Sequence, residues 1–197
     1  MRAATRRETV RGPAGRIECA VDEPAGEPRG VALIAHPHPL YGGTLDNKVV
    51  QTLARAFVEL GYTAWRPNFR GVGDSEGTHD AGRGEVEDLA AVLAHTGARR
   101  PALAGFSFGA AIQAMLATRV AAERLALVGT AVTNLSVPPV PAGSLVIHGE
   151  LDETVPLAAV LDWARAQELP VVVLPGADHF FHRKLPALKQ VVTANWK

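Results

Sequence analysis

The sequence contains almost no cysteine and no long apolar run, and each absence excludes a class of protein. Its single cysteine, Cys19, cannot form a disulfide within the chain, which is typical of a protein from a reducing compartment, so we expect the cytoplasm. No stretch approaches the roughly 20 consecutive apolar residues that a membrane-spanning helix needs. The basic segment 1–8 is followed by charged and glycine-rich sequence rather than by an apolar segment, so we expect no secretory signal.

The sequence also has no excess of charge of either sign. Its 20 Lys and Arg residues balance 20 Asp and Glu residues. No long-range field would therefore draw the protein to nucleic acid or to an anionic membrane. We expect its partner to be a small organic molecule instead.

Strand-like and helix-like runs alternate from residue 31 to the end of the chain, which predicts a mostly parallel sheet covered on both faces. Segments 8–11 and 16–21 flank a Gly-Pro-Ala-Gly turn and predict an antiparallel hairpin that opens the sheet. The length indicates one domain over residues 1–197. We therefore expect an α/β fold, a three-layer sandwich around an eight-stranded sheet. Only residues 131–143 separate two late strands, so we expect no cap domain.

The individual elements can be placed from their apolar spacing and their glycine and proline punctuation. Strands are expected at residues 31–35, 62–65, 101–104, 125–129, 144–148 and 171–174. Helices are expected from a cap at Asp46 to Gly61, over 85–95, over 110–116, over about 155–167, and from Pro186 toward Trp196.

The most informative motif is Gly105-Phe106-Ser107-Phe108-Gly109, which lies between an apolar run and a helix-like run. A serine at the apex of a sharp strand-to-helix turn is a nucleophile elbow. Such a turn forces the serine into a strained backbone conformation and leaves no room for side chains two residues to either side, which explains both glycines. The motif predicts that Ser107 is the nucleophile of a serine hydrolase.

A second stretch, residues 73–77, also fits the pattern G-x-S-x-G around Ser75. The sequence before it is polar and contains proline, and the sequence after it does not read as a helix. Carboxylates on both sides of Ser75 would also oppose the negative charge that acyl transfer builds on a carbonyl oxygen. We therefore prefer Ser107.

A serine hydroxyl becomes nucleophilic when a base takes its proton and a carboxylate holds that base. Asp152 and His179 each follow a predicted strand, so with Ser107 they fall at the carboxyl edge of the sheet, where open α/β sheets build their sites. The chain order serine, aspartate, histidine is the order expected for this architecture. His179 also follows a small-residue turn. Alternatives in the same part of the chain are Glu150, Glu153 and Asp162 for the acid and His182 for the base.

An oxyanion hole needs two backbone N–H donors, and the residue after the nucleophile, Phe108, supplies the first. The second is expected from the loop after strand 31–35, which begins His36-Pro37-His38-Pro39. Since proline has no N–H, the candidates are His38 and then Leu40 or Tyr41. We choose His38, which lies two residues after the first residue beyond the strand.

Two other chemistries compete with the serine mechanism. His36, His38, His148, His179 and His182 could together bind a metal ion, but that hypothesis leaves the serine elbow unexplained. Residues 71–73 begin like a dinucleotide-binding motif, yet Glu76 stands where the third glycine is needed. We therefore expect neither a metal nor an organic cofactor.

These motifs resemble those of the α/β-hydrolase superfamily over nearly the whole chain. The segments His36 to Thr44 and Arg70 to Gly77, together with the elbow, resemble small bacterial hydrolases related to dienelactone hydrolase and to serine-aminopeptidase-like esterases. The resemblance implies a triad of Ser107, Asp152 and His179 that works without a cofactor. Dienelactone hydrolases carry cysteine at the elbow, so their substrate is not expected here.

The short connection in place of a lid predicts an open site and a small ester or thioester as substrate, cleaved through an acyl-enzyme. Four residues could line its pocket: Leu40, Tyr41, Phe69 and Phe180. Two alternatives share the fold. A binding protein that had lost catalysis would be expected to lack a triad member, whereas an acyltransferase would use the same residues with an acceptor other than water.

Overall fold

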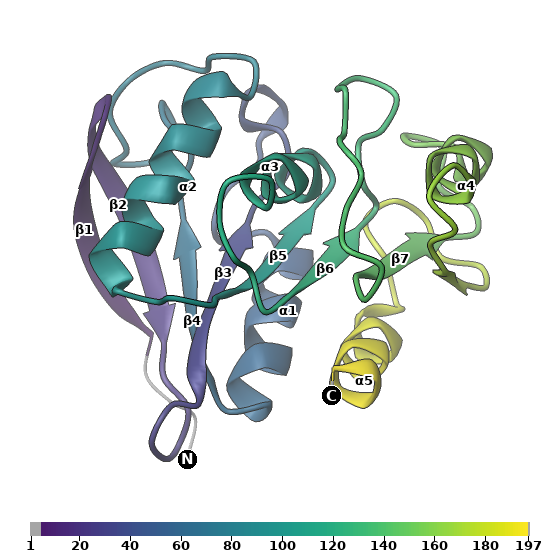
Figure 1. Cartoon of the computed structure of the whole chain (residues 1–197), viewed down its shortest axis with the longest axis horizontal. Helices are drawn as coiled ribbons and strands as arrows, with labels where there is room; N and C mark the ends of the chain where they lie inside the picture. Colours follow the sequence, from purple (N-terminus) through teal and green to yellow (C-terminus); the bar gives the residue numbers. More distant parts are fainter. Residues whose placement is uncertain (1–4, 197) are drawn as a thin grey trace.

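The computed structural model describes residues 5–196, so the first four residues of the basic N-terminal segment lie outside it. Eight strands form one sheet in the order β1-β2-β4-β3-β5-β6-β7-β8 (Figure 1). Their bounds are β1 Arg6–Gly12, β2 Gly15–Asp22, β3 Gly30–Ala35, β4 Tyr62–Pro67, β5 Ala102–Phe106, β6 Arg124–Val128, β7 Leu145–Gly149 and β8 Val171–Leu174.

Strands β1 and β2 form the predicted hairpin, with Gly12 opposite Gly15 across the turn. Strand β2 then pairs antiparallel with β4, and all later pairings are parallel. The expected eight-stranded, mostly parallel sheet with an antiparallel start is therefore confirmed. Strand β4 lies between β2 and β3, so the sheet grows in both directions from β3.

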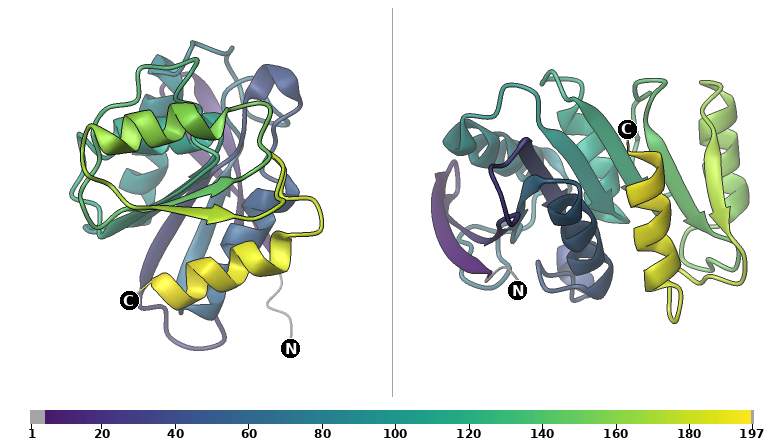
Figure 2. Two further views of the ribbon diagram at one scale, coloured as in Figure 1. Left: turned by 90° about the vertical axis from the view of Figure 1, so that its right-hand side faces the viewer. Right: turned by 90° about the horizontal axis from the view of Figure 1, so that it is seen from below.

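Helices cover both faces of the sheet, which confirms the three-layer sandwich. Helices α1 (Lys48–Glu59) and α5 (Leu185–Asn195) pack on one face, and α2 (Arg83–Thr96), α3 (Phe108–Leu116) and α4 (Leu157–Arg165) pack on the other. The left view of Figure 2 shows α4 and α5 on opposite sides of the sheet. The core is accordingly divided by the sheet into two clusters of buried apolar side chains.

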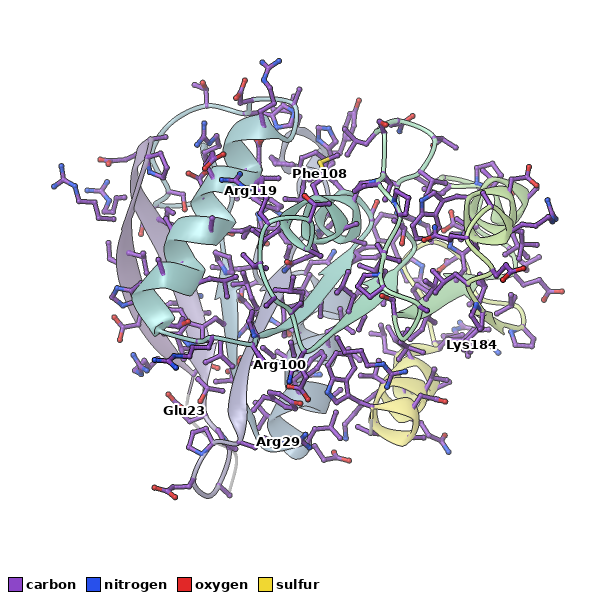
Figure 3. The ribbon with its side chains drawn as sticks, in the orientation of Figure 1. Glu23, Arg29, Arg100, Phe108, Arg119 and Lys184 are labelled. Carbon is purple, nitrogen blue, oxygen red and sulfur yellow. The ribbon has the colours of Figure 1, made fainter. Side chains whose placement is uncertain are left out.

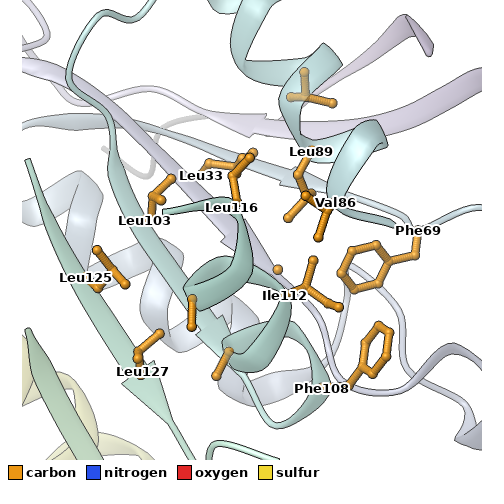
Figure 4. Close-up of a cluster of buried hydrophobic side chains, with 14 of the residues drawn as sticks. Leu33, Phe69, Val86, Leu89, Leu103, Phe108, Ile112, Leu116, Leu125 and Leu127 are labelled. Atoms are coloured by element: carbon orange, nitrogen blue, oxygen red, sulfur yellow. The ribbon is translucent and has the colours of Figure 1, made fainter. Parts of the chain in front are cut away.

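Figure 4 shows part of the cluster under α2 and α3, where leucines of the central strands meet Ile112 and the rings of Phe69 and Phe108. The two rings lie edge to face with centroids 5.4 Å apart. Strands β3 and β5 are almost wholly buried, as expected for parallel strands with helices on both faces.

The predicted cap of helix α1 was wrong by one residue. Asn47, not Asp46, is the N-cap, and its Oδ1 accepts hydrogen bonds from the backbone N–H groups of Val49 and Val50 at 2.9 and 3.4 Å. Asp46 lies one residue before the helix cap, where its carboxylate pairs with Arg7 at 3.2 Å. Either side chain can cap a helix, and here the asparagine does so.

The connection between β6 and β7 contains no helix, in agreement with the expected absence of a cap domain. Within residues 5–196, no helix is long and apolar enough to cross a membrane.

Candidate active site

Ser107 occupies the turn between β5 and α3 with φ 55° and ψ −116°, a conformation that ordinary residues rarely adopt. A Cβ atom at Gly105 would come within 2.5 Å of the Gly109 backbone, and one at Gly109 would come within 2.5 Å of the His36 carbonyl oxygen. Both glycines are therefore required by close backbone packing, as the motif predicted. The turn brings α3 directly against the end of β3.

Ser107 begins a chain of hydrogen bonds that links three loops. Its Oγ lies 3.0 Å from Nε2 of His179, and Nδ1 of His179 lies 2.7 Å from Oδ2 of Asp152. A carboxylate only accepts, so the Nδ1–H donates to Asp152 and leaves Nε2 free to accept the proton of the serine hydroxyl. The structure thus brings together the three residues predicted as nucleophile, base and acid.

The Asp152 carboxylate is held on both of its oxygens. While Oδ2 faces His179, Oδ1 accepts hydrogen bonds from the backbone N–H groups of Thr154 and Val155 at 2.9 and 2.8 Å. The other candidate acids lie elsewhere: Glu150 accepts from the Gly176 N–H at 2.7 Å, Asp162 pairs with Arg165 on α4, and Glu153 is exposed. Glu150 therefore ties the loop after β7 to the loop after β8.

The two histidines of the last loop have different environments. His179 is buried and packs on Phe106 and Phe180 with ring centroids 4.9 and 5.2 Å away. His182 is exposed and pairs with Asp178 through a 2.6 Å contact, which lowers the pKa of that carboxyl group. His182 is therefore not in the hydrogen-bond chain with Ser107.

The loop after β3 folds into a short 3-10 turn, Pro39–Tyr41. The backbone N–H groups of this turn form hydrogen bonds within the loop. Leu40 donates to Nδ1 of the His38 ring at 3.2 Å, and Tyr41 donates to the His38 carbonyl oxygen at 3.1 Å. Both alternatives for the second oxyanion donor are thus already paired. For the His38 N–H, no hydrogen-bond acceptor is found within the described part of the chain.

The side chain of His36 orients the peptide that carries this donor. Its Nδ1–H donates to the carbonyl oxygen of Pro37 at 2.6 Å, and its Nε2 accepts from the Phe69 N–H at 2.9 Å. In a trans peptide the C=O and N–H groups point in opposite directions, so the N–H of His38 is turned away from His36. Burial lowers the pKa of His36 to about 4, which keeps the ring neutral. The sequence had suggested His36 only as a metal ligand.

The five histidines considered as metal ligands do not gather into one ligand group. Besides the contacts of His36, His38, His179 and His182 given above, Nε2 of His148 lies 2.9 Å from the Val155 carbonyl oxygen. Across residues 5–196, no group of three or more His, Cys, Asp or Glu side chains is arranged to hold a metal ion.

Ser75 has a structural role. It is buried, its Oγ donates to the Asn68 carbonyl oxygen at 2.9 Å, and the same oxygen accepts from the Glu18 N–H at 2.9 Å. The hydroxyl therefore ties the loop after β4 to strand β2. The pattern G-x-S-x-G alone could not distinguish this serine from Ser107, but the absence of a strand and a helix around it did.

The four side chains predicted to line the pocket differ in exposure. Leu40 and Tyr41 are 69% and 86% exposed and lie in the loop after β3, and Phe180 is 46% exposed beside His179. Phe69, also predicted for the pocket, is 1% exposed and lies in the core beneath Phe108. Figure 3 shows Phe108 at the opposite edge of the sheet from Arg29 and Arg100, which precede β3 and β5. The site is therefore at the carboxyl edge.

Comparisons with known proteins identify the family. Residues 40–142 match the family model of the alpha/beta hydrolase fold. An alpha-beta serine hydrolase homologue from Coxiella burnetii is 40% identical, with a TM-score of 0.91 over 98% of this chain and 97% of that chain. A Xanthomonas campestris a/b serine hydrolase without a lid is 38% identical, with a TM-score of 0.89 over 97% of this chain and 93% of its own. An uncharacterized protein from Rickettsia prowazekii is 32% identical over 92% of this chain and 84% of its own length. The chain therefore belongs to the α/β-hydrolase fold family.

Proposed function

We propose that this protein is a serine hydrolase that cleaves a small carboxylic ester or thioester through an acyl-enzyme intermediate. The observation that carries the proposal is the hydrogen-bond chain from Ser107 through His179 to Asp152, with distances of 3.0 and 2.7 Å. The description of two similar proteins as serine hydrolases supports it.

In the first half of the proposed reaction, Ser107 Oγ attacks the substrate carbonyl carbon while its proton passes to Nε2 of His179. The tetrahedral intermediate collapses when the bond to the leaving group breaks and His179 returns the proton to that group. Asp152 stays ionised, holds the Nδ1–H of the ring and stabilises the imidazolium that forms. The product of this half is an ester of Ser107, and the alcohol or thiol departs.

In the second half, water attacks the acyl-enzyme and gives a proton to His179, which then protonates Ser107 Oγ as the acid leaves. In both halves the negative charge on the former carbonyl oxygen would be held by the N–H groups of Phe108 and His38. Phe108 is the first residue of α3, so the positive end of the helix dipole assists its N–H. His38 contributes an N–H that the loop itself leaves unused.

The surroundings favour a small substrate with an apolar acyl group. Residues 129–144 form a short connection without a helix, so no lid encloses the site. Phe180 offers exposed apolar surface beside His179, and Leu40 and Tyr41 expose further apolar surface on the loop after β3. A panel of p-nitrophenyl esters should show faster turnover for short than for long acyl chains. A marked preference for long-chain triglycerides would contradict this part of the proposal.

Labelling with a fluorophosphonate probe, followed by peptide mapping, tests the proposed function. We expect the label on Ser107, complete loss of labelling in Ser107→Ala, and retained labelling in Ser75→Ala, which removes the other serine of the same motif. Loss of Ser107 should lower turnover by several orders of magnitude. A folded wild-type protein that takes up no label would instead favour a non-catalytic binding protein.

A further inference from the structure

A second histidine contacts the Asp152 carboxylate from inside the protein. His148 lies in β7, one residue before the end of that strand, and its side chain, like that of Asp152, is fully buried. Its Nε2 lies 2.9 Å from the Val155 carbonyl oxygen and 3.4 Å from Oδ2 of Asp152. The same Oδ2 accepts the hydrogen bond from His179. The reaction proposed above gives this residue no role.

The surroundings determine which nitrogen of His148 carries a proton. The two groups facing Nε2 are a carbonyl and a carboxylate, which only accept, so Nε2 must be the protonated nitrogen. Burial is the largest cause that lowers the pKa of His148, and the neighbouring His179 also lowers it, while Val155 and Asp152 act in the opposite direction. The Nε2–H donates to the Val155 carbonyl oxygen, and the same group lies 3.4 Å from the Asp152 carboxylate.

The other nitrogen of His148 lowers the stability of the fold. Its Nδ1 is buried and has no hydrogen-bond partner among the described residues. A buried polar atom without a partner destabilises a fold, whereas an apolar side chain of similar size would fill the same space without that cost. If packing alone mattered at this position, histidine would be a poor choice. The useful part of the side chain is the Nε2–H.

We propose that His148 is a positioning residue: its Nε2–H fixes the Val155 carbonyl group, and the same polar edge of the ring, 3.4 Å from Oδ2 of Asp152, keeps that oxygen in the orientation that accepts the hydrogen bond from His179. The terminal torsion of an aspartate is broad, so several donors are needed to define it. The N–H groups of Thr154 and Val155 hold Oδ1, His179 holds Oδ2, and the Nε2–H of His148 lies 3.4 Å from the same oxygen. The inference rests on the proposed function only in assigning Asp152 and His179 to catalysis.

The contact also has an electrostatic consequence. With its Nε2–H 3.4 Å from Oδ2, His148 partly balances the negative charge that would otherwise act on the His179 ring alone. If the donor is lost, the carboxylate attracts the proton on His179 more strongly, and the base stays protonated, and inactive, to a higher pH. Loss of packing alone would not move the pH profile in this way.

The test compares His148→Phe, which keeps a somewhat larger aromatic ring without a donor, with His148→Gln, which can return an N–H near the original position. With a p-nitrophenyl ester, His148→Phe should move the acid limb of the pH profile of kcat/KM upward by roughly one pH unit. It should also lower kcat by roughly ten-fold, because a polar contact to a charged group has about that effect, while KM stays nearly unchanged. In His148→Gln, both the pH profile and kcat should return most of the way to their wild-type values. The matched control is His95→Gln, at an exposed histidine on α2.

A second measurement does not depend on turnover. The low-field proton resonance of the hydrogen bond between His179 and Asp152 should move in His148→Phe and stay in place in His95→Gln. A folded His148→Phe with the wild-type pH profile and resonance would overturn the proposal. Should that variant not fold, His148→Met takes its place with the same outcomes. If the resonance moves but the wild type hydrolyses no ester, the positioning role stands and the proposed function fails.

Discussion

Replacing His36 by glutamine should change the pH dependence of stability in a defined direction. The ring is fully buried, and burial lowers its pKa from the ordinary 6.5 to about 4. Above pH 6.5 neither the folded nor the unfolded chain binds a proton at this residue. Between that pH and about 4 the unfolded chain binds one and the folded chain does not, so the free energy of unfolding falls as the pH falls. Below about pH 4 both states are protonated and the effect is complete.

The size of the effect follows from the same two values. Each pKa unit corresponds to about 1.4 kcal/mol, so the difference between 6.5 and about 4 amounts to about 3 kcal/mol lost on acidification. In His36→Gln this loss is absent because the amide does not titrate. Glutamine can still offer a donor to the Pro37 carbonyl oxygen and an acceptor to the Phe69 N–H.

Urea unfolding of both proteins between about pH 7 and about pH 4 measures the effect. The wild type should be the more stable protein at neutral pH. As the pH falls to about 4, its free energy of unfolding should decrease by about 3 kcal/mol more than that of the variant. His148, whose pKa is also lowered by burial, is present in both proteins, so its contribution cancels in the difference. Parallel curves for wild type and variant would refute the reasoning, since they would mean that His36 takes up its proton equally in both states.

Three further substitutions test the local packing. Gly109→Ala places a methyl group within 2.5 Å of backbone at the end of β3, so it should displace α3 and lower the melting temperature. It should also slow fluorophosphonate labelling at least ten-fold. Unchanged labelling would contradict the close backbone packing at the elbow. Ser75→Ala should lower the free energy of unfolding in urea by about 1 to 3 kcal/mol, because a buried acceptor and a buried donor both lose a partner, and an unchanged midpoint would argue against that role. Asn47→Ala should lower the same free energy by about 1 kcal/mol through loss of the α1 cap, with Asp46→Ala as the smaller-effect comparison.

Much of the fold was predictable because it depends on spacing along the chain. Helical and strand periodicities placed the elements, and glycines such as Gly61 and Gly97 marked where helices end. Some boundaries lie one or two residues from the predicted ones: α4 begins after Pro156 rather than at Val155, and α1 is capped by Asn47 rather than by Asp46. Local residue patterns leave the order of the strands open, since the insertion of β4 between β2 and β3 is a property of pairing between distant segments.

The candidate triad was predictable for a different reason. A parallel sheet brings the carboxyl ends of its strands to one edge, so residues that follow successive strands meet there even when, like Ser107 and His179, they are 72 residues apart. The supporting contacts of His36 and His148 were missed. Both histidines lie at or directly after the end of a predicted strand, where they were candidates for metal ligands. No local sequence signal distinguishes a histidine that orients a neighbouring group from one that binds a metal.

By itself, the sequence determined where the backbone turns, which residues can occupy the strained apex at Ser107, and in what order the reactive groups follow the strands. These properties depend on local backbone preferences and on periodicity. Only the tertiary structure decided which buried polar groups pair, such as the His36 ring with the Phe69 N–H and Ser75 with strand β2. Such pairing depends on distances and burial between segments far apart in the chain, which no local pattern of residues contains.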